Sequence, residues 1–464
     1  MKPIPILISL LALISSLSSG QAYFTTGMKI GEVSDTSAII QTRLCAIETP
    51  IAISHERKAP PMRHPIGFDN DMPLAEMDGA VPGQSGKVRV TLRSSQQIFE
   101  TKWLIATGST DYIVRENFTQ LSPNTTYDVI LEGKKSALSK KQIARGSFTT
   151  APVPDAKSSI TFTASSCQYF WDFDDPERGF KAYDAMLKLK PAFHCQTGDY
   201  VYYDKPGPLA YTVEQARHKW SAMNAWSSLV DFYNQTPLYI QKDDHDVLKD
   251  DASPYSTDYG KLSFEDGINL WYEQAPISKE SPFRTFRWGK DLQLWFVEGR
   301  EFRSDNTIAD SKQKTIWGEA QKKWLVESMT KSDATFKLLI SPTPVVGPDR
   351  AKGKNDNHSN AAFATEGNWL RDFLSSLERT YVICGDRHWQ YVSKDAKTGL
   401  LEFSSGATSD EHAQGWNPDD VMPEHQFLRV KGGFLAVEVT ANESITFTHY
   451  DVDGKKVNEM TIVQ

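Results

Sequence analysis

The chain has 464 residues, which is enough for two domains with a large apolar core. Its formal net charge is −8 and its pI is about 5.8, which argues against nucleic acid as a partner, because nucleic-acid-binding proteins present basic surfaces. The charge does not exclude a phosphorylated substrate, since bound cations can dominate the field of an acidic site.

Residues 1–22 have the pattern of a secretory signal peptide. A short basic start at Lys2 is followed by an almost wholly apolar run over residues 4–17 and by small side chains at residues 18–22. The apolar run is shorter than the roughly 20 residues that a membrane-spanning helix needs. We therefore expect a secreted or periplasmic protein, with no transmembrane segment in the mature chain.

Residues 23–153 predict an N-terminal all-β domain. Short alternating runs between turn residues are typical of half-buried antiparallel strands, as in an immunoglobulin-like or fibronectin-like sandwich. Pro152 and Pro154 indicate a linker at its end, because prolines cannot continue a central strand. A stretch rich in Pro and Met, residues 58–86, interrupts the domain and predicts a surface loop.

Residues 154–464 change to an alternation of strands and helices. Helical spacing over residues 179–189 and 213–233 lies between apolar, β-rich runs. The expected strands are residues 160–165, 191–197, 237–241, 292–297, 336–340, 381–384, 401–404, 434–439 and 445–448. Alternating elements followed by a run of strands predict a layered α/β sandwich.

Polar clusters follow three of these strands, where a loop can point side chains out of a sheet and into a crevice. Asp, His and Tyr gathered there can bind hard or borderline cations, and an unligated His can move protons. The clusters are Gly198-Asp199-Tyr200-Val201-Tyr202, Asp243-Asp244-His245-Asp246 and Gly385-Asp386-Arg387-His388. Together they predict a two-metal hydrolase.

Each signal also has a plainer interpretation. Asp199 alone is more often a turn residue or a helix N-cap than a metal ligand, and residues 243–246 can form a solvated acidic turn. Cys167 would ordinarily be a small buried hydrophobic residue. The order of the clusters along the chain and the strands before them favour the metal site.

The set of motifs resembles the PhoD-like alkaline phosphatase branch of the calcineurin-like metallophosphoesterases. In this chain the Ser-Cys-Gln, Gly-Asp-x-x-Tyr, Asp-Asp-His-Asp/Glu and Gly-Asp-x-His blocks of that branch are matched at residues 166–168, 198–202, 243–246 and 385–388. Residues 298–303 are similar to its Asp-x-Arg-x-x-Arg segment, with Glu298 in place of Asp. The resemblance implies a layered α/β/β/α metallophosphoesterase domain over residues 154–464, after the β domain.

The resemblance also implies a mixed iron and calcium centre. Thiolate, phenolate and carboxylate are anionic donors that suit a trivalent ion, and carboxylates suit a hard cation such as Ca²⁺. The ligands implied for Fe³⁺ are Cys167, Asp199, Tyr202 and Asp386. Asp199 would bridge to Ca²⁺, whose shell Asp244 and His388 would complete. Zn²⁺ and Mn²⁺ stay open as alternatives.

The implied activity is exported hydrolysis of phosphate monoesters, diesters or both, by a hydroxide that two cations activate. Asp244 and His245 would be catalytic, with His245 as the general acid that protonates the leaving group. Arg300, Arg303 and Arg387 could clamp phosphate, although salt bridges within the fold explain each of them equally well. We expect the protein to be a monomer.

Two other functions stay open. One is a phospholipase D-like phosphodiesterase acting on lipid head groups, which an exposed aromatic entrance would favour. Aromatic residues that could form such an entrance are Trp171, Tyr200, Tyr203 and Trp389. The other is a non-catalytic, Ca²⁺-stabilised surface protein that binds a polymer, but the presence of His245 among the candidate ligands argues against it.

Overall fold

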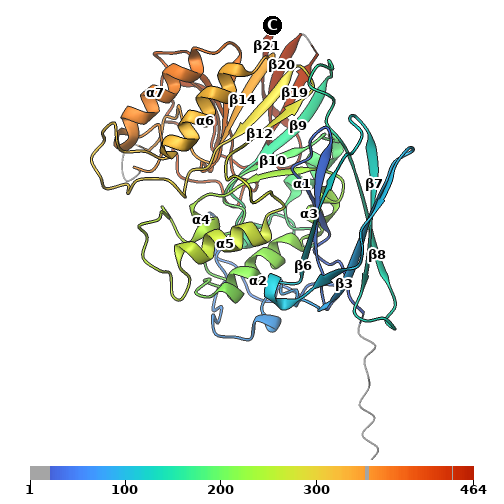
Figure 1. The fold of residues 1–464 in the computed structure, drawn as a ribbon. Helices are drawn as coiled ribbons and strands as arrows, with labels where there is room; N and C mark the ends of the chain where they lie inside the picture. Colours follow the sequence, from blue (N-terminus) through green and yellow to red (C-terminus); the bar gives the residue numbers. More distant parts are fainter. Residues whose placement is uncertain (1–20, 351–354, 442, 464) are drawn as a thin grey trace, which may run out of the picture.

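The computed structural model describes residues 21–350, 355–441 and 443–463 (Figure 1). The predicted signal peptide lies outside these residues, apart from its last two positions. In the described part of the chain, no helix combines the length and the apolar character that crossing a bilayer requires.

The largest sheet joins strands from both halves of the chain. In spatial order its strands are β21 (Lys456–Val463), β20 (Ser444–Tyr450), β19 (Phe434–Thr440), β9 (Ile160–Ser165), β10 (His194–Thr197), β11 (Leu238–Gln241), β1 (Met28–Gly31), β2 (Ser37–Arg43) and β6 (Ile113–Thr119). β9, β10 and β11 are parallel neighbours. β1 is also parallel to β11, through Gly31 and Leu238, so the N-terminal strands continue the sheet of the predicted catalytic domain.

A second sheet faces the first. In spatial order its strands are β12 (Arg284–Trp288), β13 (Leu292–Phe296), β14 (Phe336–Ser341), β15 (Thr380–Cys384), β17 (Leu401–Ser405), β16 (Gln390–Lys394) and β18 (His425–Arg429). The strands from β13 to β17 in this order are parallel, and antiparallel strands flank them on both sides.

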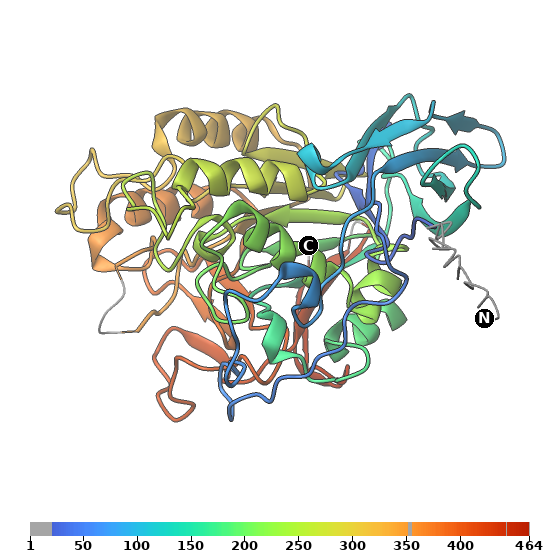
Figure 2. The ribbon, with the colours of Figure 1, turned by 90° about the horizontal axis from the view of Figure 1, so that it is seen from below.

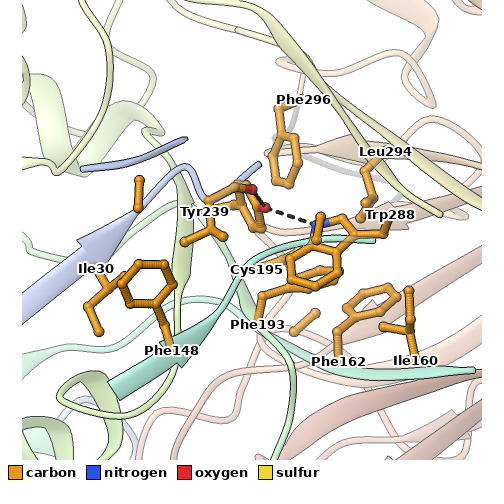
Figure 3. Packing of buried hydrophobic residues seen from close by; sticks show 14 of the residues in the cluster. Ile30, Phe148, Ile160, Phe162, Phe193, Cys195, Tyr239, Trp288, Leu294 and Phe296 are labelled. Atoms are coloured by element: carbon orange, nitrogen blue, oxygen red, sulfur yellow. Dashed lines mark hydrogen bonds between the residues drawn. The ribbon is translucent and has the colours of Figure 1, made fainter. Parts of the chain in front are cut away.

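Apolar side chains from the facing sides fill the space between the two sheets (Figure 3). Phe162 and Phe193 stack with their ring centroids 4.6 Å apart, and Trp288 of the second sheet lies 4.7 Å from Phe193. Trp288 Nε1 donates a 2.9 Å hydrogen bond to the Tyr239 hydroxyl, so its polar tip is paired inside the core. Two sheets packed in this way hold the ends of their strands, and the loops that follow, in fixed positions.

Helices cover the outer faces of both sheets. An apolar cluster joins the first sheet to α1 (Lys181–Lys188), α2 (Val213–Asn224), α3 (Ser227–Tyr233), α4 (Asp244–Val247) and α5 (Phe264–Gln274). A separate cluster joins the second sheet to α6 (Gly318–Lys331) and α7 (Ala364–Ser375), which lie beside that sheet in Figure 1. The predicted layered α/β/β/α sandwich is confirmed.

A third sheet belongs to the N-terminal β region. It consists of β4 (Ile98–Glu100), β3 (Gly86–Arg93), β7 (Thr126–Lys134) and β8 (Gln142–Thr149), with β5 (Leu104–Ala106) paired to β3. Val90 and Val129 of this sheet lie in the same apolar cluster as Ile40 of β2. Apart from two short 3-10 turns, the regular elements of residues 23–153 are therefore all β strands, as expected. The boundary at residue 153 stays a prediction, because the first sheet crosses it.

Short 3-10 turns complete the fold: η1 (Leu74–Glu76), η2 (Gly108–Thr110), η3 (Phe170–Asp172) and η4 (Ala361–Phe363).

Residues 55–66, here called the strap, leave the N-terminal sheets and lie against the catalytic layers (Figure 2). Arg57 Nη1 donates hydrogen bonds to the carbonyls of Trp171 and Phe173, at 2.8 and 2.7 Å. The Met62 N–H donates to the Glu411 carbonyl at 3.0 Å. Part of the predicted surface loop thus connects two distant segments of the catalytic region.

Candidate metal centre

Four strand ends meet at one place between the two sheets. Cys167, Asp199, Asp243 and Asp386 lie two residues beyond the ends of β9, β10, β11 and β15, respectively. Cys167, Asp199 and Asp386 have left-handed backbones, with φ of 49°, 55° and 64°. Such conformations cost about 1–3 kcal/mol each and cluster at functional sites. A Cβ on Gly198 would lie 2.7 Å from the Asp243 Cβ, so glycine lets two of these loops approach closely.

A first group of donor atoms surrounds one carboxylate oxygen of Asp199. The Cys167 Sγ lies 3.5 Å from Asp199 Oδ2, and the Tyr202 hydroxyl lies 3.1 Å from the same oxygen. A ring nitrogen of His388 is within 4.8 Å of ligand atoms of both Cys167 and Asp199. Sulfur, phenol, carboxylate and imidazole donors in this arrangement suit a transition-metal ion.

A second group consists of carboxylates only. Asp199, Asp243 and Asp386 offer oxygens that lie within 4.8 Å of one another, which suits a hard cation. A third group joins Asp199 to Asp244 and His245. The structure therefore brings all six predicted ligands together, but it places His388 beside Cys167 and Asp386 beside Asp243.

Asp243 had no assigned role in the sequence prediction. It ion-pairs with Arg300 Nε, whereas Asp244 Oδ1 lies 3.5 Å from Arg300 Nη2. One sequence signal could have identified it: Asp243 follows its strand by the same two residues as Asp199.

The residues of the centre fit metal ions. Burial raises the pKa of Asp199 well above its usual value, and the Asp244 and Asp386 carboxylates raise it further, although His245 opposes them. Burial also raises the pKa of Asp243, despite the Arg300 guanidinium beside it. Among the described residues, Asp199 Oδ1 and Asp243 Oδ2 are buried without a hydrogen-bond partner. Buried carboxylates of this kind need positive charge nearby.

His245 lies in the first turn of α4 beside the carboxylates. Its Nδ1 is 2.7 Å from Asp204 Oδ1, which leaves Nε2 as the nitrogen that can exchange a proton with a substrate. Burial lowers the pKa of His245, but the carboxylates of Asp204 and Asp244 outweigh burial and raise it to about 10. Cations bound beside His245 would lower its pKa.

The three arginines predicted to bind phosphate are buried and make internal contacts. Arg300 Nε pairs with Asp243, and Arg387 Nη2 lies 2.8 Å from Asp349. Arg303 Nη2 donates hydrogen bonds to the Asp356 carbonyl and to the side-chain amide oxygen of Asn306. Internal pairing is therefore present for all three, and a phosphate clamp stays a prediction.

Sequence reasoning missed His412. It lies in the loop after β17, is fully buried, and its Nε2 is 2.9 Å from the Tyr202 hydroxyl. Neither a motif nor a regular spacing marks it in the sequence.

Asp246 fixes two of the ligand loops. Its carboxylate accepts hydrogen bonds from the backbone N–H groups of Asp199 and Val201, both at 2.8 Å, and of Asp243, at 3.0 Å. The contact with the Asp243 N–H is also part of the capping box at the start of α4. The loops after β10 and β11 therefore share one acceptor.

Asp246→Ala is expected to lower the free energy of unfolding by about 3 kcal/mol or more, because three buried N–H groups lose a charged acceptor. Metal content should fall with it. Asp266→Ala is the matched control, since Asp266 closes a capping box with Ser263 in α5 and belongs to none of the donor groups of the centre. The control should cost about 1 kcal/mol and leave metal content unchanged. Urea denaturation measures the free energy of unfolding, and elemental analysis measures the metal content. Equal losses of stability and metal in the two variants would contradict the role of Asp246 in holding the ligand loops.

The chain is similar to known phosphatases in sequence and in fold. A family model described as PhoD-like phosphatase matches residues 162–431. A solved structure described as that of PhoD superposes with a TM-score of 0.71 at 19% identity, covering 94% of this chain and 89% of that chain. A purple acid phosphatase from yellow lupin (Lupinus luteus) seeds superposes with a TM-score of 0.64 at 10% identity, covering 94% of this chain and 74% of that chain. At these identities the structural similarities support the fold alone. No curated protein matches the chain.

Proposed function

Because the chain belongs to the PhoD-like phosphatase family and is a metal-dependent phosphoesterase, we propose that it hydrolyses phosphate monoesters, diesters or both at the centre around Asp199. The observation that carries this proposal is the convergence of donor groups from four strand ends, with Asp199 common to every group. Export through the predicted signal peptide is part of the proposal.

In this proposal each of two metal ions has its own set of ligands, and Asp199 belongs to both sets. The ligands of the first ion are Cys167, Asp199, Tyr202 and His388, and the thiolate and phenolate donors among them favour Fe³⁺. The ligands of the second ion are Asp199, Asp243 and Asp386, with Asp244 beside them, and their oxygen donors favour Ca²⁺. The family resemblance implied Asp386 as an Fe³⁺ ligand and His388 as a Ca²⁺ ligand. The distances support the opposite assignment of these two residues.

Bound metal ions would neutralise phosphoryl oxygens and lower the pKa of a water molecule at this site. The chain's own groups supply the remaining tasks. His245 holds a proton on Nε2 for the leaving alkoxide while Asp204 fixes its ring through Nδ1. Arg300 holds the Asp243 carboxylate in place, and Asp246 holds both ligand loops.

The burial of the aromatic residues weighs against a lipid substrate. The four aromatics considered for an exposed entrance, Trp171, Tyr200, Tyr203 and Trp389, are each at most 1% exposed. They belong to apolar clusters of the fold, so they offer no surface to a lipid. We therefore favour a water-soluble ester.

The test is hydrolysis of an aryl phosphate monoester and of the matched diester by the purified protein, before and after metal removal with a chelator. We expect turnover of at least one ester, its loss on chelation and its return when metal ions are added back. The monoester-to-diester ratio identifies the preferred class. Turnover that survives complete metal removal would contradict the proposal. A folded, metal-loaded protein without turnover on either ester would favour the Ca²⁺-stabilised binding protein instead.

A further inference from the structure

Asp172 and His412 form a buried pair behind the candidate metal centre. Asp172 ends η3, His412 lies in the loop after β17, and both side chains are 0% exposed. Asp172 Oδ2 is 2.6 Å from His412 Nδ1, a distance at which the carboxylate accepts the Nδ1–H and fixes the tautomer of the ring. The remaining nitrogen, Nε2, then points in a fixed direction.

That nitrogen faces two of the proposed metal ligands. His412 Nε2 is 2.9 Å from the Tyr202 hydroxyl and 3.2 Å from His388 Nε2. The ring centroids of His412 and His388 are only 4.2 Å apart. His412 therefore restricts the orientation of both side chains through a hydrogen bond and through direct packing.

The strap holds both members of the pair. The Arg63 N–H donates a hydrogen bond to Asp172 Oδ1, the carboxylate oxygen that His412 does not use. The Met62 N–H bonds the carbonyl of Glu411, the residue before His412, and Arg63 Nη1 lies 3.4 Å from the Glu411 carboxylate. The strap thus links the N-terminal part of the chain to the back of the centre.

We infer that Asp172 and His412 are positioning residues, which hold Tyr202 and His388 in the geometry that binds the first metal ion. This inference rests on the proposed function, because it needs a metal bound by those two ligands. Residues that orient ligands through hydrogen bonds commonly contribute about 10- to 100-fold to metal affinity. A buried carboxylate and imidazole that contact the proposed ligands Tyr202 and His388 fit that role.

The test measures Co²⁺ binding to the metal-stripped, full-length protein, followed by the absorption of the cobalt–thiolate bond to Cys167. His412→Ala is expected to lower the Co²⁺ affinity by about 10- to 100-fold. His412→Gln should recover most of this loss, because its side-chain amide can accept a hydrogen bond from the His388 ring or donate one to the Tyr202 phenolate. The number of Co²⁺ ions bound at saturation should stay that of the wild type in both variants.

His194→Ala is the matched control for the loss of a buried imidazole. His194 is also 0% exposed, but its ring nitrogens bond Thr163 and Ser165, at 2.9 and 3.1 Å, and neither of these partners is a proposed ligand. It should lower the unfolding temperature without changing the Co²⁺ affinity.

Three results overturn the inference. The first is an unchanged affinity in His412→Ala, or a His412→Gln variant no better than alanine. The second is the loss of a whole equivalent of Co²⁺, which would make His412 a ligand. The third is an equal fall in affinity in His194→Ala. A wild type that turns over esters and binds Co²⁺, with His412→Ala unchanged, overturns this inference alone, whereas a wild type that does neither overturns the proposed function as well.

Discussion

Asp199→Asn is expected to lower kcat/KM for any ester that the protein hydrolyses by at least about 10³-fold. Asparagine keeps the size of the side chain, but it removes the charge and one carboxylate oxygen at the point common to all groups of donors. Metal ions contribute several kcal/mol of transition-state stabilisation, and about 4 kcal/mol corresponds to about 10³-fold in rate. Steady-state kinetics and elemental analysis of the same samples measure the effect.

Asp291→Asn is the control for this variant. Asp291 is fully buried, and one of its carboxylate oxygens has no hydrogen-bond partner among the described residues, as in Asp199. It lies in the turn between β12 and β13, where it accepts from Thr335. Metal content and kcat/KM should stay at wild-type values. An Asp199→Asn protein that kept its metal and its turnover would contradict the central role of Asp199.

The strands that carry the candidate ligands could be predicted closely from the sequence. β9 was expected at residues 160–165 and spans Ile160–Ser165, and β11 was expected at 237–241 and spans Leu238–Gln241. Both are central strands that pair in parallel with β10, and such strands appear in the sequence as apolar runs that end at polar loops.

The helix boundaries were harder to predict. Residues 213–233 were expected to be helical, and they form two helices, α2 and α3, with a break at Trp226 that the spacing did not indicate. The Trp226 ring packs on Phe170 and Phe173, with centroid distances of 5.4 and 5.1 Å. Contacts with residues so distant in sequence override local helical periodicity.

Local patterns also could not determine which acidic side chains face the centre. α4 spans only Asp244–Val247, far shorter than a helix that forms by itself, so its position depends on the surrounding structure. That position sends Asp243 towards Asp199 and Asp386 and allows Asp246 to bind the ligand loops. The pairing of His412 with Asp172 joins residues 240 positions apart, which no motif could indicate.

His245→Gln is expected to lower kcat by about 10²–10⁴-fold for an alkyl phosphate ester, because an alkoxide leaves slowly without a proton. Glutamine preserves a side-chain N–H near Asp204 but cannot give up a proton as imidazolium does. An aryl phosphate should lose much less, since a phenolate with a low pKa leaves without protonation. The measurement is kcat for a series of esters that differ only in the pKa of the leaving group.

The slope of that series separates proton donation from damage to the metal centre. If His245 only supported the neighbouring ligands, its loss would slow alkyl and aryl esters by the same factor, and metal content would fall. If His245 is the general acid, the dependence on leaving-group pKa becomes steeper while metal content stays constant. Asp204→Asn should change the slope in the same direction but by less, because the Asp204 carboxylate orients the ring and does not transfer the proton itself. An equal fall for all esters in both variants would therefore assign His245 to the support of the metal site and leave the proton donor to be sought among other residues of the centre.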